Sequence, residues 1–160
     1  MTINIGDTLP QANLTVATSE GPRPMSTDDI FKGKRVALFA VPGAFTPTCS
    51  AKHVPSFKDN AGLIKAKGVD TIACLSVNDA FVMKAWGEDQ KVGDDILMIA
   101  DGSGDFTRAL GLTMDASKFG MGERSQRYSM IVDDGVVEQL NVEAGGEFKV
   151  SSGDYLLAQL

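Results

Sequence analysis

Residues 35–49 read RVALFAVPGAFTPTC and carry the clearest structural signal in the chain. The run over 35–41 is almost continuously apolar and is bounded by a glycine and a proline, a pattern typical of a buried strand. Residues 42–48 contain two prolines, a glycine and two threonines, which predicts a loop. Apolar residues then recur at helical spacing until Gly68. The stretch therefore predicts a strand, a loop and a helix in succession.

The same alternation of strand and helix patterns extends on both sides of this stretch. Right-handed crossovers would make the early strands parallel, whereas the last two strands are expected to pair as a hairpin across residues 133–135. The chain therefore predicts an α/β sandwich with a mixed sheet. The expected strands cover residues 12–18, 35–41, 69–77, 96–100, 127–132 and 136–142, the expected helices cover 26–31, 54–68, 79–90, 105–110 and 155–160, and a turn is expected at 21–24.

Length and charge limit the classes of protein to which the chain can belong. Its 160 residues fit one domain, which we expect to span residues 1–160. The formal net charge of −6 disfavours nucleic acid and anionic lipid as partners, and no apolar run approaches the roughly 20 residues of a membrane helix. The chain has two cysteines and its N-terminus shows no basic region followed by an apolar stretch. We therefore expect a cytoplasmic protein that binds neither nucleic acid nor membrane.

Cys49 is the first candidate nucleophile. Thr46 followed by Pro47 is typical of a helix N-cap with proline at the first helical position, which would make Cys49 the third helical residue. Its sulfur would then lie beside unpaired backbone N–H groups at the positive end of the helix dipole, where the reactive thiolate is stabilised. The alternative is a small apolar residue packed at a helix start, and position alone leaves both interpretations open.

The other cysteine, Cys74, lies in the middle of the expected strand over residues 69–77. Free cysteine is among the most buried residue types, so an inert packing role is the leading interpretation. The alternative is a resolving cysteine that attacks oxidised Cys49, which requires Cα atoms within about 7 Å. With His53 as the one histidine, the chain has fewer Cys and His residues than the four ligands of a structural zinc site, and we expect no metal.

The spacing Pro42-x-x-x-Thr46-x-x-Cys49 resembles the active-site signature of the peroxiredoxins, and PGAFTPTCS over residues 42–50 resembles their type V subfamily. Further segments match in the same order along nearly the whole chain. The resemblance implies a thioredoxin-like fold with a mixed central sheet flanked by helices. It also implies that a Cys49 thiolate reduces hydrogen peroxide and alkyl hydroperoxides and becomes a sulfenic acid. The further matching segments are residues 53–55, 73–83, 101–106, 127–130 and 140–143.

The resemblance implies roles for several residues around Cys49. Thr46 would donate its hydroxyl to a peroxide oxygen, although the same hydroxyl could instead cap the helix. Pro42 would shield the thiolate from water. Gly43 and Thr48 would contribute to the substrate-binding loop.

A cation beside the thiolate is the remaining requirement of this chemistry. Arginine suits it because the guanidinium is always charged and offers two coplanar donors. Spacing alone does not say which of the chain's arginines reaches the sulfur. The type V pattern places the active-site arginine directly before an aromatic-Ser-Met strand, which here selects Arg127, with Arg124 as the close competitor.

His53 and Phe119 each admit a functional and a structural interpretation. His53 lies one helical turn after Cys49, but Pro55 is expected to bend the helix there, so we expect a supporting rather than a catalytic role. Phe119 with Gly120 matches a family Phe-Gly beside the pocket, where the ring would form an apolar wall of the substrate site. An ordinary core phenylalanine is the alternative.

The resemblance also bears on the reductant and on assembly. Some type V members carry a resolving cysteine near the C-terminus, where this chain has Ser151 and Ser152. This departure predicts a one-cysteine mechanism in which an external thiol reduces the Cys49 sulfenic acid. Glutathione with glutaredoxin is the expected donor and thioredoxin the second candidate, with no bound cofactor. The resemblance further implies a homodimer packed near the active-site loops.

Two other classes of function are compatible with the sequence. A peroxide sensor or thiol relay would use the same reactive Cys49 but pass the oxidation to a partner protein. A non-catalytic thioredoxin-like binding module would carry an unreactive Cys49.

Overall fold

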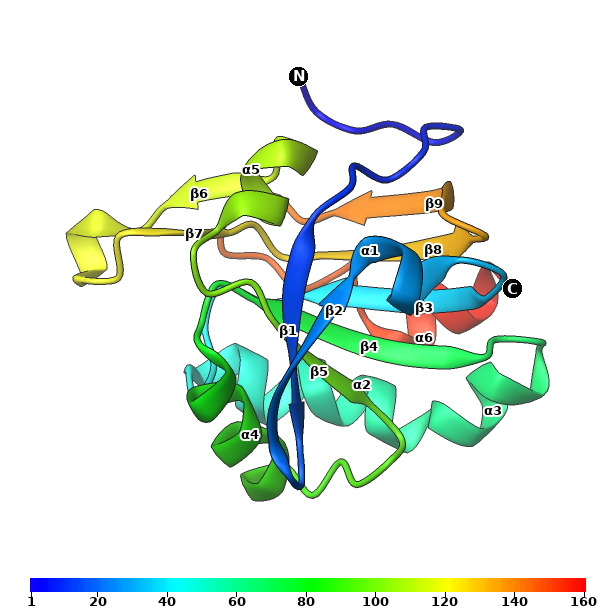
Figure 1. Ribbon diagram of the computed structural model, residues 1–160, viewed down its shortest axis with the longest axis horizontal. Helices are drawn as coiled ribbons and strands as arrows, with labels where there is room; N and C mark the ends of the chain where they lie inside the picture. The colour runs from blue at the N-terminus through cyan, green and yellow to red at the C-terminus, as the bar shows by residue number, and fades with distance from the viewer.

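A seven-stranded mixed sheet forms the centre of the structure, with helices on both of its faces (Figure 1). The computed structural model describes residues 1–160. The strands of this sheet are β1 (Asn13–Thr18), β2 (Gly21–Ser26), β3 (Arg35–Ala40), β4 (Thr71–Ser76), β5 (Leu97–Ala100), β8 (Tyr128–Asp133) and β9 (Val136–Val142). Their order is β2-β1-β5-β4-β3-β8-β9, in which β3, β4 and β5 are parallel and the other neighbours are antiparallel. The predicted α/β sandwich with a mixed sheet is confirmed.

Each face of the sheet has its own apolar core, because successive side chains of a strand point to opposite faces. On β3, Phe39 belongs to one core and Leu38 to the other. The first core is covered by α2 (Val54–Asp59), α3 (Ala61–Ala66), α4 (Ala80–Asp89) and α6 (Gly153–Ala158), and the second by α1 (Thr27–Phe31) and α5 (Asp105–Leu110). None of the helices has the length and apolar character of a membrane span.

The N-terminal hairpin corrects one prediction. The turn lies at residues 19–20, and the segment expected to be a turn is part of the edge strand β2. Pro22 and Pro24 fit there because an edge strand leaves part of its backbone without a partner in the sheet, so a missing N–H costs little. Proline-rich sequence was therefore a misleading signal at this edge.

A small antiparallel arm, formed by β6 (Thr113–Asp115) and β7 (Glu123–Ser125), projects from one end of the molecule (Figure 1). These strands have three residues each, too few for a recognisable alternation of apolar and polar side chains, so the sequence did not predict them. The arm carries two residues that the sequence singled out, Phe119 at its tip and Arg124 on β7.

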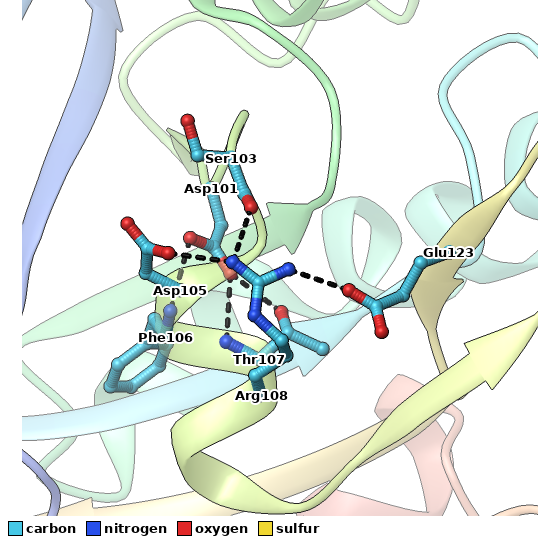
Figure 2. A network of polar contacts seen from close by, with 7 residues as sticks. All are labelled: Asp101, Ser103, Asp105, Phe106, Thr107, Arg108 and Glu123. Carbon is cyan, nitrogen blue, oxygen red and sulfur yellow. Dashed lines mark hydrogen bonds and ion pairs between the residues drawn. The ribbon is translucent and has the colours of Figure 1, made fainter.

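Arg108 ties the arm to helix α5 (Figure 2). Its guanidinium donates to Glu123 Oε1 at 2.6 Å, to Asp105 Oδ1 at 2.6 Å and to the carbonyl of Ser103 at 2.8 Å. These groups are exposed, so the ion pairs add little stability. Their bonds nevertheless define where the arm leaves the body of the molecule.

Buried Asp101 joins β5 to α5 in the same region (Figure 2). Its carboxylate accepts hydrogen bonds from the N–H groups of Phe106 and Thr107, at 3.2 and 2.8 Å, and from the Thr107 hydroxyl at 2.7 Å. These bonds satisfy N–H groups in the first turn of α5 that have no partner within the helix.

Candidate active site

Cys49 lies where the chain leaves β3 and enters the next helix. That helix begins at Pro47, and the backbone N–H groups of Thr48 and Cys49 have no acceptor within the protein. The Cys49 side chain is fully buried, and its thiol is free of any disulfide. The sulfur is therefore placed at the positive end of a helix and is shielded from bulk water.

The helical turn that contains Cys49 is wider than an α-helical turn. Over η1 (Cys49–His53) the backbone forms a π-helical turn, in which the Val54 N–H donates to the Cys49 carbonyl. Pro55 has no N–H to donate to the carbonyl four residues earlier, so the α-helical pattern cannot run unbroken through this position. The bend expected at Pro55 takes the form of this π turn, a feature that is frequent at functional sites.

Arg127 is the cation beside the sulfur. It lies directly before β8, is half-buried, and donates from Nη2 to Cys49 Sγ at 3.1 Å. Arg124 instead donates from Nε to the carbonyl of Met121 at 2.8 Å. The structure therefore brings Arg127, rather than Arg124, to the sulfur.

His53 connects Arg127 to the C-terminal segment. Its Nδ1 lies 2.8 Å from Arg127 Nη1, and its Nε2 lies 2.8 Å from the carbonyl oxygen of Ser151. A guanidinium only donates and a carbonyl only accepts, so we assign the ring proton to Nε2. Burial, and then the positive charge of Arg127, lower the pKa of His53 to about 3, with the hydrogen bond to Ser151 acting in the opposite direction. The ring is therefore neutral near pH 7.

This geometry favours a supporting role for His53. Both ring nitrogens are already engaged, and neither makes a hydrogen bond to Cys49, so the ring is not placed to accept the thiol proton. His53 accepts a hydrogen bond from Nη1 of Arg127, while Nη2 of the same guanidinium donates to the sulfur.

Aromatic rings enclose the His53 side chain. The ring centroids of Phe39, Phe57 and Phe148 lie 4.8, 5.7 and 5.1 Å from that of His53. Phe148 also lies 6.0 Å from the guanidinium carbon of Arg127, within reach of a cation–π contact. The sequence alone did not single out Phe148, because its loop has no regular pattern.

The loop before the cysteine is held in a tight turn. The Thr46 hydroxyl donates to the Gly43 carbonyl at 2.6 Å and accepts no hydrogen bond from an N–H group of the helix. The Ala44 N–H donates to Asn78 Oδ1 at 3.0 Å, which fixes the loop to the end of β4. Gly43 is buried, and a Cβ there would lie 2.9 Å from the Met121 methyl carbon. A side chain at this position would therefore require the Met121 side chain to move.

Pro42 and Thr48 stand at the two ends of this loop and are half-buried. The Thr48 side chain makes no hydrogen bond within the protein, whereas its N–H is one of the two unpaired donors described above. The two residues therefore border the cysteine loop, as a shield and a substrate-binding residue would need to do.

Phe45 is the strained residue of the loop. Its φ of 63° lies in the left-handed region that few non-glycine residues adopt, and its ring is exposed. The ring lies 6.5 Å from that of Trp86, whose Nε1 donates to Ser50 Oγ at 3.0 Å. The single tryptophan of the chain is thus in contact with the residue next to Cys49.

Phe119 is exposed at the tip of the arm. It ends η2 (Ser117–Phe119) at the tip of the arm, and its side chain is 71% exposed. This exposure contradicts the core alternative, whereas the role of Phe119 as a wall of the substrate site stays a prediction. The arm projects away from the sheet (Figure 1), which is consistent with the exposure of the ring.

Cys74 lies in the middle of β4 and is also fully buried. It is opposite Phe39 of β3 and Met98 of β5 in the sheet register. Burial, and then the proximity of Cys49, raise the pKa of the Cys74 thiol well above its ordinary value, with Arg127 acting in the opposite direction. Cys74 therefore stays protonated near neutral pH.

A wide surface groove lies away from the cysteine loop. Its volume is about 560 Å³, and its lining runs from Ala17 on β1 past Lys84 on α4 to Met98 on β5, without any residue of the cysteine loop. A peroxide group has only two oxygen atoms and needs no large cavity. The polar geometry around Cys49 therefore identifies the candidate site better than cavity size does.

Known proteins are similar to this sequence over almost its whole length. The model of the Redoxin family matches residues 4–157. Peroxiredoxin-2E-2, chloroplastic, of Oryza sativa subsp. japonica is 51% identical over 164 residues, which cover 99% of this chain and 73% of that protein. Peroxiredoxin-2B of Arabidopsis thaliana is 47% identical over 159 residues, which cover 99% of this chain and 98% of that protein. The chain therefore belongs to the Redoxin family and, within it, to the peroxiredoxins.

Solved structures show the same architecture. The crystal structure of reduced Prx3 in complex with H₂O₂ from Vibrio vulnificus matches with a TM-score of 0.94 and 56% identity, over 99% of both chains. The predicted thioredoxin-like fold is thereby confirmed. As a peroxiredoxin, the chain is a thiol-dependent peroxidase and an oxidoreductase.

Proposed function

We propose that Cys49 is the peroxidatic residue of a type V peroxiredoxin that reduces hydrogen peroxide and alkyl hydroperoxides. One observation carries the proposal, the hydrogen bond of 3.1 Å from Arg127 Nη2 to Cys49 Sγ. A guanidinium in direct contact stabilises the anionic sulfur that nucleophilic attack requires. The unpaired N–H groups at the start of the helix act in the same direction.

The reaction transfers two electrons from sulfur to peroxide. The Cys49 thiolate attacks the distal oxygen, so that an S–O bond forms while the O–O bond breaks, and the cysteine becomes a sulfenic acid. The departing alkoxide or hydroxide takes a proton from water and leaves as an alcohol or as water. Sulfur is oxidised by two electrons, and the peroxide is reduced by the same two.

Fixed donors support this transfer of charge. Negative charge moves from sulfur to the leaving oxygen, so donors around both atoms lower the barrier. Arg127 Nη2 and the N–H groups of Thr48 and Cys49 are available on the sulfur side. The Thr46 hydroxyl, which donates to Gly43 in the free protein, would exchange that acceptor for a peroxide oxygen.

An external thiol would complete the cycle. Cys74 stays protonated within the core, and the C-terminal segment has Ser151 and Ser152 in place of a resolving cysteine. One thiol would attack the sulfenic sulfur and release water, and a second would attack the resulting mixed disulfide and release the Cys49 thiolate. Glutathione with glutaredoxin is the proposed donor, and thioredoxin is the second candidate.

A homodimer in the cytoplasm is the proposed form of the protein. Phe45, Phe81 and Phe119 are 52%, 71% and 71% exposed in the single chain, and a second copy would remove such rings from water. Two free, unpaired cysteines fit a reducing compartment. Sedimentation at micromolar concentration tests the dimer.

The test of the proposed function compares Cys49→Ser with Cys74→Ala. Peroxide consumption is measured with glutathione and glutaredoxin, and separately with thioredoxin. We expect Cys49→Ser to abolish consumption and Cys74→Ala to retain it, and undiminished turnover of Cys49→Ser would refute the proposal. Mass spectrometry after one equivalent of peroxide identifies the product as sulfenic acid, internal disulfide or glutathione adduct. A single rapid oxidation without turnover on small thiols would instead favour a sensor or relay.

A further inference from the structure

Glu143 follows β9, and its side chain organises the C-terminal segment. The residue is buried, with 9% of its surface exposed. Its Oε2 accepts hydrogen bonds from the N–H groups of Lys149, Val150 and Ser151, at 2.7, 2.9 and 2.9 Å, and from the Ser151 hydroxyl at 2.6 Å. One carboxylate oxygen thus collects four donors and closes the loop over residues 144–151.

The Glu143 carboxylate is ionised in this setting. Burial alone would raise its pKa, but the hydrogen bonds from Ser151, Lys149 and Val150 outweigh burial and lower the pKa overall. The four bonds to Oε2 are therefore charge-assisted, and such bonds are roughly twice as strong as neutral ones.

The hydrogen bonds of Glu143 close into a ring that passes through the active site. The Glu143 N–H donates to the Arg127 carbonyl at 3.0 Å, and Arg127 Nη1 donates to His53 Nδ1 at 2.8 Å. His53 Nε2 donates to the Ser151 carbonyl at 2.8 Å, and the Ser151 N–H returns to Glu143 Oε2. Arg127 is thus held at its backbone carbonyl and at Nη1 of its guanidinium, while the other terminal nitrogen, Nη2, donates to Cys49.

A second set of contacts holds the same segment against the cysteine helix. The Gly153 N–H donates to Ser56 Oγ at 2.9 Å, and Ser56 Oγ donates to the His53 carbonyl at 2.7 Å. A Cβ at Gly153 would collide with the carbonyl oxygen of Ser56. The C-terminal segment therefore approaches the helix that carries His53 as closely as backbone atoms permit.

We propose that Glu143 is a positioning residue of the peroxidatic site: its carboxylate orients Ser151, and through it His53 and Arg127. The inference rests on the proposed function of Cys49 and Arg127. Without the carboxylate, the three N–H groups of the loop lose their common acceptor and the Ser151 carbonyl is free to turn. His53 then loses the acceptor that fixes its ring, and Arg127 loses the partner that holds Nη2 against the sulfur.

Three variants test the proposal. Glu143→Ala removes all four bonds to the side chain, whereas Glu143→Gln keeps an acceptor oxygen and removes the charge. Glu147→Ala is the matched control, because it removes the same charge from the same loop. The Glu147 side chain makes only an exposed ion pair with Lys149 at 3.5 Å. Urea unfolding first establishes that each variant is folded.

Two measurements report on the site itself. Stopped-flow fluorescence of Trp86, the single tryptophan, follows oxidation of Cys49 by hydrogen peroxide, and iodoacetamide labelling between pH 4 and 9 follows Cys49 reactivity without peroxide. For Glu143→Ala we expect oxidation at least about tenfold slower and a labelling profile moved to higher pH, because a displaced donor stabilises the anionic sulfur less. For Glu143→Gln we expect a smaller change in the same direction, on the order of threefold. Glu147→Ala should match the wild type.

A folded Glu143→Ala protein with the wild-type oxidation rate and labelling profile would overturn the proposal. If Glu143→Ala does not fold, Glu143→Gln decides by the same two criteria. A wild-type protein whose Cys49 does not react with peroxide would refute the proposed function instead. The labelling profiles would then still decide whether Glu143 positions the groups around the sulfur.

Discussion

Cys49 and Cys74 are equally buried, but only the Cys49 sulfur is in contact with a charged side chain. Both side chains are fully inaccessible to solvent and belong to the same apolar core. Cys49 stands at the start of a helix with Arg127 at 3.1 Å, whereas Cys74 stands mid-strand with apolar neighbours in the sheet. Burial therefore does not distinguish the two cysteines, whereas the donor aimed at the Cys49 sulfur does.

The contrast follows from the cost of burying charge. An isolated anion in an apolar core costs several kcal/mol, so a buried thiol without a partner remains protonated. At Cys74 this cost is not offset, and its raised pKa is the result. At Cys49 the Arg127 guanidinium lies against the sulfur, and the neutral His53 ring accepts from Arg127 without adding a second positive charge.

Removing the Arg127 guanidinium should reduce the difference between Cys49 and Cys74 more than any other change. For Arg127→Met we expect the second-order rate of Cys49 oxidation by hydrogen peroxide to fall by about 10²–10³, the range for loss of one preorganised donor to a developing charge. Arg127→Lys should recover little, because an ammonium cannot bridge His53 and the sulfur as a planar guanidinium does. Stopped-flow fluorescence of Trp86 measures both rates.

Arg124→Met is the matched control for this change. Arg124 carries the same charge and lies three residues away, but its Nε donates to the Met121 carbonyl rather than to the sulfur. We expect its oxidation rate to stay within about threefold of the wild type. Equal losses in Arg124→Met and Arg127→Met would show that net charge, rather than the contact, activates Cys49.

Much of the site around Cys49 was predictable from local sequence. The apolar run over residues 35–41 predicted β3, and Thr46-Pro47 located the start of the helix that carries the cysteine. These signals are local, because strand burial and helix capping depend on neighbouring residue types. Arg127 is 78 residues from Cys49, so spacing could not have paired them, and only the family resemblance selected it.

The closed set of hydrogen bonds through Glu143 could not be predicted from sequence patterns. The acceptor for His53 is the backbone carbonyl of Ser151, 98 residues away, and every residue type has a carbonyl. The loop over 144–151 has no periodic pattern from which its path could be inferred. The π turn was equally hidden, because Pro55 predicts that the α-helical pattern is disturbed but not how the backbone resolves it.

Acid should weaken the fold through His53, the hydrogen-bond partner of Arg127. The pKa of His53 is about 3 in the folded chain and near 6.5 when exposed, so between these values the unfolded chain binds a proton that the folded chain does not. The free energy of unfolding is therefore not reduced by His53 above about pH 6.5, and it decreases as the pH falls below that value. Between pH 8 and pH 5 we expect the free energy of unfolding to drop by about 2 kcal/mol.

Urea unfolding at several pH values measures this effect, and His53→Gln is its control. His53 is the only histidine of the chain, and carboxylates titrate mostly below pH 5, so the variant should lose most of the pH dependence in this window. A wild-type stability that is flat from pH 8 to pH 5 would show that the ring is protonated as readily in the folded chain as in the unfolded one.

The smallest effect is expected at Cys74. Cys74→Ala removes one buried sulfur from an apolar strand, which should cost about 1 kcal/mol of stability in urea unfolding. Turnover with an external thiol should stay within about twofold of the wild type, because no donor activates the Cys74 sulfur. Iodoacetamide should label the folded wild-type protein at Cys49 alone and the urea-unfolded protein at both cysteines.

The opposite outcome at Cys74 would change the mechanism. If Cys74→Ala abolished turnover and peroxide produced a Cys49–Cys74 disulfide in the wild type, Cys74 would be a resolving cysteine. That reaction requires the sulfur to leave the middle of β4, between β3 and β5, and therefore local opening of the central sheet. An increase in backbone hydrogen exchange of β4 upon oxidation would accompany it, whereas a β4 that stays protected leaves the external thiol as the only route back to the Cys49 thiolate.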